Sequence, residues 1–191
     1  MIVPIDVTTI RIETERLFLR PLLEQDLDFF RKMTALAEVA EFSGWSATTD
    51  EEEIRKRFDK HLNTKETLAI CWRDTNAVIG TFSIQNRPWN IYPIDQSLGG
   101  REFGFDLLPE YWGRGIMPEA VRAVTDYCFH ALHYDFVSAG YFHGNQRSRR
   151  VIEKCGFHYH HTANNVPCAI EGVLRTEHIS CLSKEEWQSV R

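Results

Sequence analysis

The sequence predicts a mixed α/β fold in which helices flank a single central sheet of about seven strands. Segments with the two-residue period of strands alternate with segments of helical period, in an order that is not a regular strand–helix–strand repeat. The chain has 191 residues, which is the usual length of one domain, and we expect one domain over 1–191. Its composition, 43% hydrophobic and 26% charged, is typical of a globular protein with a buried core and excludes a disordered chain.

The first half of the chain predicts three strands and two helices. They are expected at 16–21 (strand), 23–30 (helix), 49–62 (helix), 67–73 (strand) and 78–85 (strand). Thr49 and Glu52 fit a capping box, which sets the expected start of the second helix. The segment 86–100, with its Pro, Trp and Gly residues, is expected to be a long loop, and loops of this length are more often functional than accidental.

The second half predicts four strands and three helices. They are expected at 101–108 (strand), 116–132 (helix), 136–141 (strand), 145–154 (helix), 157–163 (strand), 172–181 (strand) and around Trp187 (helix). Asn145 is the expected N-cap of its helix, and Gly156 is the glycine expected after its end. Ser183 and Glu186 form a capping box for the last helix.

The net charge is −5, from 22 Lys plus Arg and 27 Asp plus Glu. Generic nucleic-acid binding depends on basic surfaces, so this charge argues against a nucleic-acid partner and only weakly favours cationic substrates. No apolar run is long enough to cross a membrane, and the first residues lack the basic and apolar regions of a signal peptide. We therefore expect neither a nucleic-acid nor a membrane partner.

The cysteines and histidines bear on compartment and metal binding. The five cysteines form no CxxC pair and are Cys71, Cys128, Cys155, Cys168 and Cys181. An odd number without pairing motifs predicts free, buried thiols in a reducing cytoplasm. His158, His160 and His161 cluster in a predicted strand, but no Cys or carboxylate stands beside them at a familiar metal-ligand spacing. We expect half-exposed strand histidines there, and no metal.

The stretch from Glu102 to Val121 combines a strand, a glycine-containing turn and the start of a helix. Gly113 and Gly115 let the backbone approach a ligand closely, and the helix N-terminus offers unpaired N–H groups and the positive end of its dipole. Together these features predict an anion site suited to a pyrophosphate. Two glycines before a helix are common, however, and the pattern is neither GxGxxG nor Walker A.

The stretch from Asn145 to Phe157 places Asn145, Ser148 and Ile152 on one helix face, at spacings of three and four residues. Taken alone, this is equally the pattern of a capped amphipathic helix that buries Val151 and Ile152 in the core.

The two stretches together resemble the GNAT superfamily of acetyl-CoA-dependent N-acetyltransferases. Three segments resemble its branch of ribosomal-protein N-terminal (Rim-type) acetyltransferases. They are Leu-Arg-Pro-Leu at 19–22, Pro-Glu-Tyr-Trp-Gly-Arg-Gly-Ile-Met at 109–117 and Asn-x-x-Ser-x-x-Val-x-Glu-Lys-x-Gly-Phe at 145–157. Gly-Val-Leu-Arg at 172–175 fits that branch too. The resemblance covers about 10–187 and implies a GNAT-like, mostly antiparallel sheet.

The superfamily's cofactor signature, Gln/Arg-x-x-Gly-x-Gly/Ala, falls here on Trp112, Gly115 and Met117. Trp112 and Met117 depart from it, although Trp at the first place is familiar in the Rim-type branch. The resemblance implies acetyl-CoA as cosubstrate and no metal. The residues implied to bind acetyl-CoA are Leu107 and Leu108 where the strands 101–108 and 136–141 splay apart, Trp112, Gly113, Arg114, Gly115, Ile116 and Met117 around the pyrophosphate, and Asn145 and Ser148 beside the pantetheine arm.

Many superfamily members carry a tyrosine near the end of this second helix, as the acid for the departing thiolate. Ile152 stands at that place here, which excludes a tyrosine acid at that position. Ser148 could donate a hydrogen bond to the thiolate; His143 titrates in a suitable range but is equally an ordinary loop residue, and Tyr141 is a further candidate. A thiolate whose pKa is about 8.5, as for cysteine, is also tolerable without protonation.

The need for a base depends on the acceptor amine. An α-amine has a pKa of about 7.7–8, whereas a lysine amine at about 10.4 costs roughly 3.5 kcal/mol more to deprotonate. An α-amine therefore needs little help, and a carboxylate acting through water would suffice. Glu102 is the candidate, on the strand face that it shares with Gly104 and Asp106; it could equally be a solvated carboxylate paired with Arg101.

With the resemblance, the sequence predicts an enzyme that moves acetyl from acetyl-CoA to a primary amine, preferably a protein N-terminus, by direct attack in a ternary complex. The loop 86–100 and the early helices, with Phe42, Trp45 and Trp89, would form the acceptor cleft, although these aromatics would serve equally as core or homodimer contacts. One alternative is a small-molecule acceptor such as a polyamine or an amine antibiotic. The other is an acyl-CoA-binding sensor without catalysis, and the intact glycine turn is compatible with both.

Overall fold

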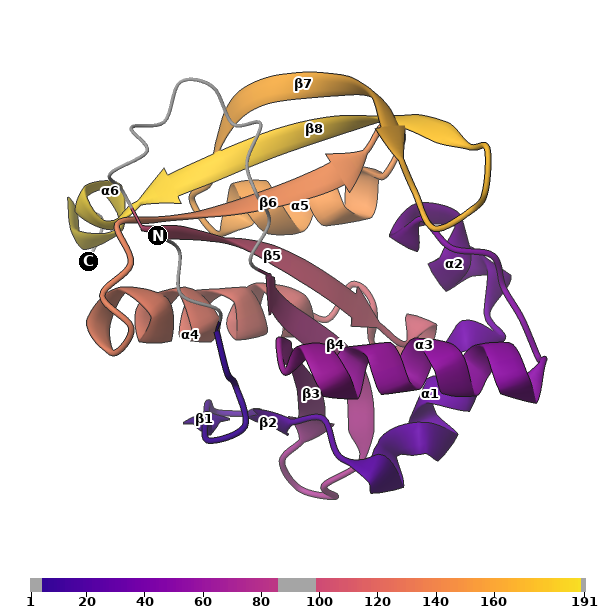
Figure 1. The fold of residues 1–191 in the computed structure, drawn as a ribbon. Coiled ribbons are helices and arrows are strands. Elements are labelled where there is room, and N and C mark those ends of the chain that lie inside the picture. Colours follow the sequence, from indigo (N-terminus) through magenta and orange to yellow (C-terminus); the bar gives the residue numbers. More distant parts are fainter. Residues whose placement is uncertain (1–4, 86–98, 190–191) are drawn as a thin grey trace.

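Helices pack on both faces of one mixed sheet (Figure 1). The computed structural model describes residues 5–85 and 99–189, so most of the expected loop at 86–100 lies outside the described residues. The strands are β1 (Ile12–Glu13), β2 (Leu17–Pro21), β3 (Thr67–Trp72), β4 (Val78–Gln85), β5 (Gly100–Leu107), β6 (Phe136–Phe142), β7 (His158–Pro167) and β8 (Leu174–Ser183). The helices are η1 (Glu24–Asp26), α1 (Leu27–Thr34), α2 (Ala37–Ser43), α3 (Glu51–Thr64), η2 (Pro109–Tyr111), α4 (Ile116–His130), α5 (Gln146–Lys154) and α6 (Lys184–Ser189).

The eight strands lie in the order β1-β2-β3-β4-β5-β6-β8-β7. Every neighbouring pair is antiparallel except β5 and β6, which are parallel and are connected through α4. The mixed, mostly antiparallel sheet is therefore confirmed. The sheet has one strand more than the seven predicted. The additional strand is β1, whose two residues are too few to show the alternation by which strands are predicted.

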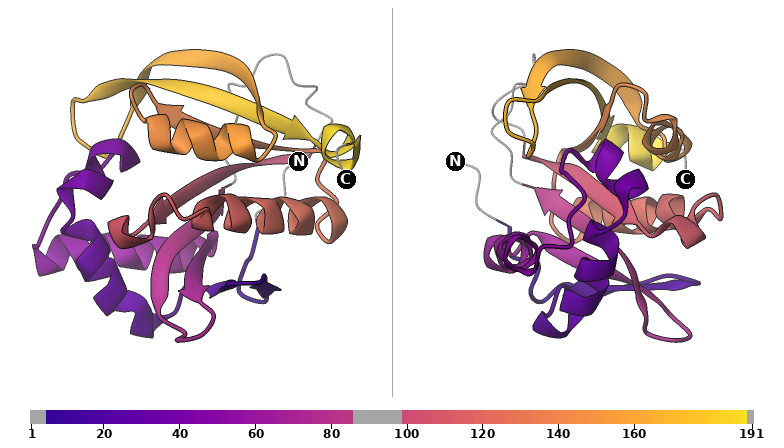
Figure 2. Two further views of the ribbon diagram at one scale, coloured as in Figure 1. Left: turned by 180° about the vertical axis from the view of Figure 1, so that it is seen from behind. Right: turned by 90° about the vertical axis from the view of Figure 1, so that its right-hand side faces the viewer.

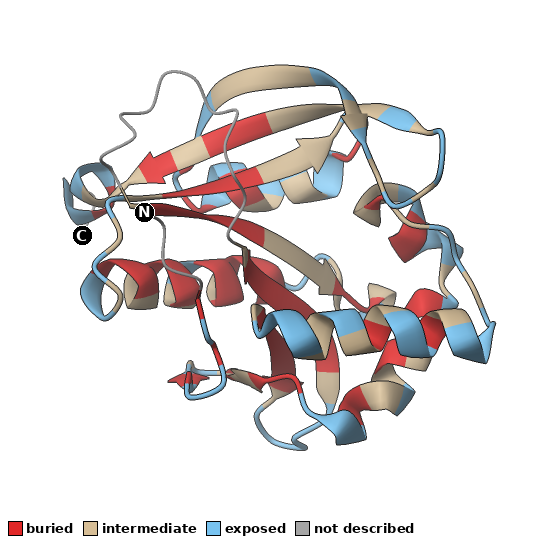
Figure 3. Ribbon diagram, viewed as in Figure 1, coloured by how far each residue is buried: buried red, intermediate tan, exposed pale blue. Residues whose placement is uncertain are grey.

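The core consists of two clusters of buried side chains, one on each face of the sheet (Figure 3). Strand β2 shows why: Leu17 and Leu19 join the cluster under α4 and α5, while Phe18 points to the cluster under α1 and α3. From behind, α4 and α5 lie in front of the sheet (Figure 2). Phe129 on α4 and Phe58 on α3 are fully buried in the two clusters. The sheet is thus covered on both sides.

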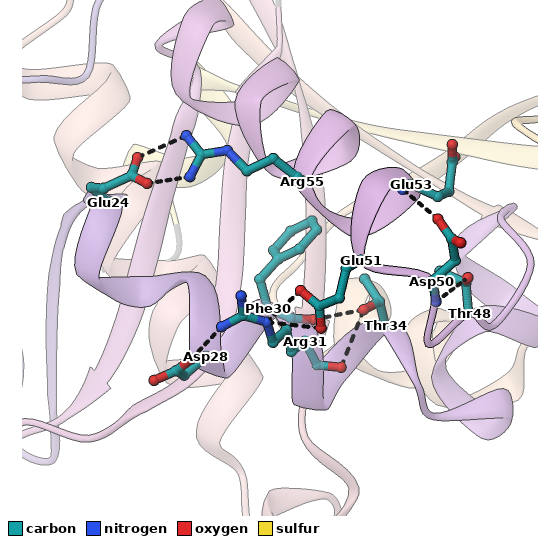
Figure 4. Close-up of polar contacts among 10 residues, drawn as sticks. All are labelled: Glu24, Asp28, Phe30, Arg31, Thr34, Thr48, Asp50, Glu51, Glu53 and Arg55. Carbon is teal, nitrogen blue, oxygen red and sulfur yellow. Dashed lines mark hydrogen bonds and ion pairs between the residues drawn. The ribbon is translucent and has the colours of Figure 1, made fainter.

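The N-cap of helix α3 is one residue later than the predicted Thr49 (Figure 4). Asp50 is its N-cap and accepts a hydrogen bond from the Glu53 amide at 2.8 Å. The Glu53 carboxylate binds Arg57 at 2.8 Å instead of returning to the cap. The predicted Thr49–Glu52 capping box is therefore wrong, because a single Asp cap replaces it.

Two arginines link the early helices to one another (Figure 4). Arg31 on α1 binds Glu51 on α3 at 2.9 Å, and Arg55 on α3 binds Glu24 of η1. These exposed pairs contribute little stability individually, but they orient α1 and α3 on the face where α2 also lies. Helix α2 was not predicted.

The predicted caps of the second half are confirmed. Asn145 accepts a hydrogen bond from the Ser148 amide at 3.0 Å, and Gly156 adopts a φ of 85° after α5. Ser183 and Glu186 exchange hydrogen bonds as a capping box predicts. All five cysteines are free thiols, and Cys71, Cys128 and Cys155 are buried, whereas Cys168 and Cys181 are half-buried. Within the described residues, no helix has the length and apolar character needed to traverse a bilayer.

Candidate active site

Strands β5 and β6 pair over only half of β5 and then diverge, toward the right of Figure 1. Their register begins with Gly100 opposite Phe136 and ends with Phe103 opposite Ala139. The splay expected between these two strands is therefore present, and it begins after Phe103.

Backbone groups of β5 face this splay. Leu108 donates its N–H to the carbonyl of Ile79 on β4 at 2.9 Å. Because successive residues of a strand direct their N–H and C=O groups to opposite edges, those of Leu107 point away from β4, toward the splay. The Leu107 carbonyl accepts a hydrogen bond from the Trp112 indole at 2.8 Å. Leu107 thus lies where a ligand can reach its backbone, whereas Leu108 faces β4 and is buried in the cluster under α1 and α3.

The glycine turn follows β5 and leads into α4. Gly113 and Gly115 have φ values of 74° and 73°, a left-handed conformation that favours glycine. Gly115 is the N-cap of α4 and provides no side-chain cap, so the amides of Ile116 and Met117 head the helix. Trp112 and these four residues all line one cavity.

An ion pair supports this turn from outside the cavity. Arg16 binds Glu119 of α4 through Nε at 2.7 Å and Nη2 at 2.6 Å, and its Nη1 donates to the Arg114 carbonyl at 3.0 Å. Burial alone would raise the pKa of Glu119, but hydrogen bonds from Thr14 and Arg16 lower it. The turn is thereby tied to the residues that precede β2.

At the N-terminus of α5, Asn145 and Ser148 also line the cavity. The Asn145 amide donates to the Ser148 hydroxyl at 3.0 Å, which leaves the hydroxyl proton of Ser148 to be donated elsewhere. Ile152 does not face the cavity; it is 1% exposed and packs in the core. The predicted burial of Ile152 is therefore confirmed, whereas Val151 is only half-buried and lines the cavity.

The cavity has a volume of about 660 Å³ and separates charges by sign. Among the described residues, the arginine and lysine residues that line it all come from α5: Arg147, Arg150 and Lys154. The carboxylates come from α2, β5 and β8: Glu38, Glu102, Asp106 and Glu177. One wall is thus cationic and lies beside the glycine turn, and the other is anionic.

The anionic wall holds the predicted candidate Glu102 and a second carboxylate to which no role was assigned. Glu102 is 6% exposed. Asp106, on the same face of β5, is half-buried and accepts a hydrogen bond from the Ser43 hydroxyl of α2. Burial raises the pKa of Asp106, and the bond from Ser43 opposes the rise. Sequence reasoning missed this pair because it missed α2.

The end of α2 is held by the turn between β7 and β8 and by the start of β8. Ala169 donates to the Gly44 carbonyl at 2.8 Å, and Arg175 donates to the Glu41 carbonyl at 2.6 Å. Arg175 belongs to the Gly-Val-Leu-Arg segment noted in the sequence. Phe42 and Trp45, predicted to form the acceptor cleft, both line the cavity, whereas Trp89 lies outside the described residues.

Three predicted residues lie elsewhere. His143 is exposed, and its Nδ1 lies 3.1 Å from Nε2 of His178 rather than in the cavity lining. Arg114 is exposed with its guanidinium over Tyr111, 5.7 Å from the ring centroid. Leu108 is the third, as described above. Tyr141 does line the cavity.

The histidine cluster of β7 shows no metal geometry. Nδ1 of His160 lies 2.9 Å from Nδ1 of His161, and the described residues contain no group of three or more His, Cys, Asp or Glu arranged to hold a metal ion.

Parted strands, a glycine turn at a helix N-terminus and a cationic wall define a site for an elongated ligand with a phosphate-rich end. A family model described as "Acetyltransferase (GNAT) domain" matches residues 16–158. The chain belongs to this family and is an N-acetyltransferase of the acetyl-CoA-dependent kind.

Named relatives agree with this assignment. The chain is 28% identical over 151 residues to "Uncharacterized N-acetyltransferase YoaA" of Bacillus subtilis, covering 76% of this chain and 81% of the relative. It is 29% identical over 149 residues to "Uncharacterized N-acetyltransferase p20" of Bacillus licheniformis, covering 75% and 80%. The crystal structure of a GNAT-family acetyltransferase from Bacillus anthracis matches with a TM-score of 0.78 at 20% identity, over 92% of this chain and 99% of that one.

Two other solved structures share the fold and have named acceptors. Ribosomal-protein-S5-alanine acetyltransferase from Vibrio fischeri has a TM-score of 0.67 at 19% identity, over 93% of this chain and 98% of that one. Spermidine N-acetyltransferase from Vibrio cholerae, in complex with CoA and spermine, has a TM-score of 0.70 at 18% identity, over 92% and 99%. At these identities the likeness concerns the fold alone.

Proposed function

We propose that the protein transfers the acetyl group of acetyl-CoA to a primary amine that arrives as a cation, preferably the α-amine of a protein N-terminus, by direct attack in a ternary complex. The observation that carries this proposal is the separation of charge in the cavity. The cationic wall of α5 suits the phosphates of CoA, and the anionic wall suits an ammonium group.

The residues present fit acetyl-CoA. The amides that head α4 lie at the positive end of the helix dipole, next to the glycine turn, where they would bind a phosphate. Leu107 presents backbone groups to the splay, and Asn145 with Ser148 lines the far side. When bound, acetyl-CoA supplies the acetyl group as a thioester. Ser148 would donate its hydroxyl proton in a hydrogen bond to the departing sulfur, and a carboxylate of the anionic wall, for which Glu102 is the candidate from the sequence, would accept a proton from the acceptor amine.

An α-amine is preferred because a considerable fraction of it, roughly a tenth or more, is already neutral at pH 7. Segments of the Rim-type kind and the fold likeness to an alanine acetyltransferase that acts on a ribosomal protein support the same acceptor. A location in the reducing cytoplasm, where such N-termini occur, accords with the five free thiols.

A polyamine is the second candidate, and a specific observation favours it. Four carboxylates line the acceptor side, from three different elements, which is more negative charge than one ammonium group requires. The fold likeness to a spermidine acetyltransferase accords with this acceptor.

The test is CoA release from acetyl-CoA in the presence of peptides with free α-amines, spermidine or an aminoglycoside. Peptide turnover supports the preferred acceptor, and turnover of small amines alone would replace it by the second. Glu102→Gln should lower kcat/KM, because it removes one of the charges that attract the ammonium group, while Glu13→Gln, an exposed strand carboxylate outside the cavity, should leave kcat/KM unchanged. Acetyl-CoA binding without turnover of any amine would instead indicate a sensor.

A further inference from the structure

Asp106 occupies the half of β5 that has lost its parallel neighbour. Pairing with β6 ends at Phe103, and Asp106 keeps only its β4 partner, Thr81. Glu102 lies in the paired half, opposite Ser138. Four residues of a strand span about 13 Å, so the two carboxylates are well separated along the cavity. Asp106 is the carboxylate at the splay, where Leu107 presents its backbone and the thioester is placed by the proposed function.

The carboxylate of Asp106 is embedded in a short hydrogen-bond chain. The Ser43 hydroxyl lies in hydrogen-bond contact with Asp106 and 2.9 Å from the Val39 carbonyl. A hydroxyl has one proton, so it cannot donate to both acceptors. With Asp106 ionised, Ser43 donates to the carboxylate. With Asp106 protonated, the carboxyl donates to Ser43, and Ser43 donates to Val39. Both protonation states of Asp106 are therefore accommodated by reversing one hydrogen bond.

We infer that Asp106 is a catalytic proton acceptor that contacts the acceptor amine, and that Ser43 is its positioning residue. The inference rests on the proposed amine acetylation. Asp106 takes one proton from the ammonium, leaving a neutral amine whose lone pair forms the new C–N bond as the C–S bond breaks. The sulfur keeps that electron pair and takes the second amine proton, so that the products are the amide and the CoA thiol. Asp106 then returns its proton to water.

Other titratable groups line the same cavity as Asp106, and their charges affect its ionisation. They are Glu38 on α2, His61 on α3, Glu102 on β5, Tyr111 in η2, Tyr141 on β6, Glu177 on β8, and Arg147, Arg150 and Lys154 on α5. The pKa of Asp106 is raised by burial and held back by Ser43. Removing the Ser43 hydroxyl should therefore raise that pKa further, which a purely structural role of Ser43 does not predict.

Three variants test the inference, with whichever peptide amine or spermidine the wild type acetylates. Asp106→Asn should lower kcat/KM at pH 7 by about 100-fold, within the usual range for loss of an acid–base group. Its dissociation constant for acetyl-CoA, measured by calorimetry, should stay unchanged. Ser43→Ala should move the acid limb of kcat/KM to higher pH. Asp28→Asn, an exposed carboxylate of α1 whose side chain is 91% exposed, is the matched control and should change neither.

Two readouts do not depend on turnover. In carboxyl-labelled protein, the resonance missing from Asp106→Asn should titrate above the usual range for aspartate, and higher still in Ser43→Ala. Asp106→Asn should also melt at a higher temperature than wild type at pH 7, because partial burial disfavours the charged carboxylate and asparagine carries no charge.

The inference is overturned if Asp106→Asn keeps the wild-type rate and acid limb, or if it loses acetyl-CoA binding. A resonance in the ordinary aspartate range that does not respond to Ser43→Ala also overturns it. Failure of the wild type to acetylate any amine while binding acetyl-CoA counts against the proposed function instead, and the carboxyl titration remains a separate result.

Discussion

At the scale of single residues, the backbone conformation of Gly115 rather than crowding explains why glycine stands there. A Cβ built on Gly115 would lie 3.7 Å from Nη2 of Arg16, an ordinary contact. Its φ of 73°, however, is costly for any other L-residue, by roughly 1–2 kcal/mol and more for a β-branched one. The sequence pointed to close ligand approach, and the structure adds this conformational reason.

Gly115→Val should therefore weaken acetyl-CoA binding by about tenfold, because the turn must either carry the strain or change shape. Calorimetric titration with acetyl-CoA measures this loss of affinity. Gly156→Val is the matched control, since Gly156 has a φ of 85° with nothing within 4 Å of a built Cβ, but follows α5 outside the cavity lining. It should lower stability and leave affinity unchanged. Equal affinities for wild type and Gly115→Val would place the pyrophosphate elsewhere.

At the scale of elements, the sequence was informative where a local pattern alone determines the structure. Strands and the caps at Asn145 and Ser183 are such patterns: the two caps and every strand except the two-residue β1 were predicted. The start of α3 was not, because Thr49 with Glu52 and Asp50 with Glu53 have the same spacing, and only the folded chain selects between them. Short-range pattern cannot separate two equivalent caps one residue apart.

Helix α2 was missed because it has seven residues, and its N-cap, Leu36, makes no side-chain capping bond. Its position depends on long-range contacts with Ala169 and Arg175, which no local pattern records. Missing α2 also affected the description of the site. The sequence placed Asp106 on the correct face of its strand, but it did not identify Ser43 of α2 as the partner of Asp106. The glycine turn before α4 and the Asn145 cap of α5, by contrast, were predictable, since each is a short continuous segment of sequence.

The support of the glycine turn by Arg16 yields a prediction at this scale. Arg16→Lys should raise the KM for acetyl-CoA severalfold with little change in kcat, because lysine cannot bind Glu119 and the Arg114 carbonyl as a planar fork does. Steady-state kinetics with varied acetyl-CoA measures it. Arg31→Lys likewise removes a guanidinium that bridges two groups, the exposed Glu51 and Asp28, and should leave this KM unchanged. A fall in kcat alone would contradict the supporting role of Arg16.

At the scale of the whole molecule, a net charge of −5 carried little information, because the number does not say where the charges lie. Folding collects three cations from one helix on one wall of the cavity and four carboxylates from three elements on the other. No alternation or spacing rule connects residues as distant as Glu38 and Glu177. The sign and position of charge in the site are therefore properties of the sheet topology, which brings β8 and α2 to the same cavity.

The stability of the molecule should depend on pH through His61. This α3 side chain lines the cavity, and its Nδ1 lies 3.0 Å from the Thr67 hydroxyl, which is itself 3.0 Å from that of Ser83. Burial, with a smaller effect of Lys60, lowers the pKa of His61 from 6.5 to about 4. Below pH 6.5 the unfolded chain takes up a proton that the folded one refuses, so stability falls as the pH drops toward 4, by up to about 3 kcal/mol.

Urea unfolding between pH 4 and pH 7.5 measures this dependence. His61→Gln should lose most of the slope between pH 6.5 and 4, since its side chain does not titrate. His130→Gln is the control: His130 is exposed near the end of α4, and its replacement should keep the wild-type slope. If His61→Gln and wild type showed parallel profiles, another group would have to bind the proton on unfolding. Because His61 lines the acceptor side of the cavity, local unfolding at low pH should start around this side chain. The KM for the acceptor amine should therefore rise in the same pH range, before the affinity for acetyl-CoA falls.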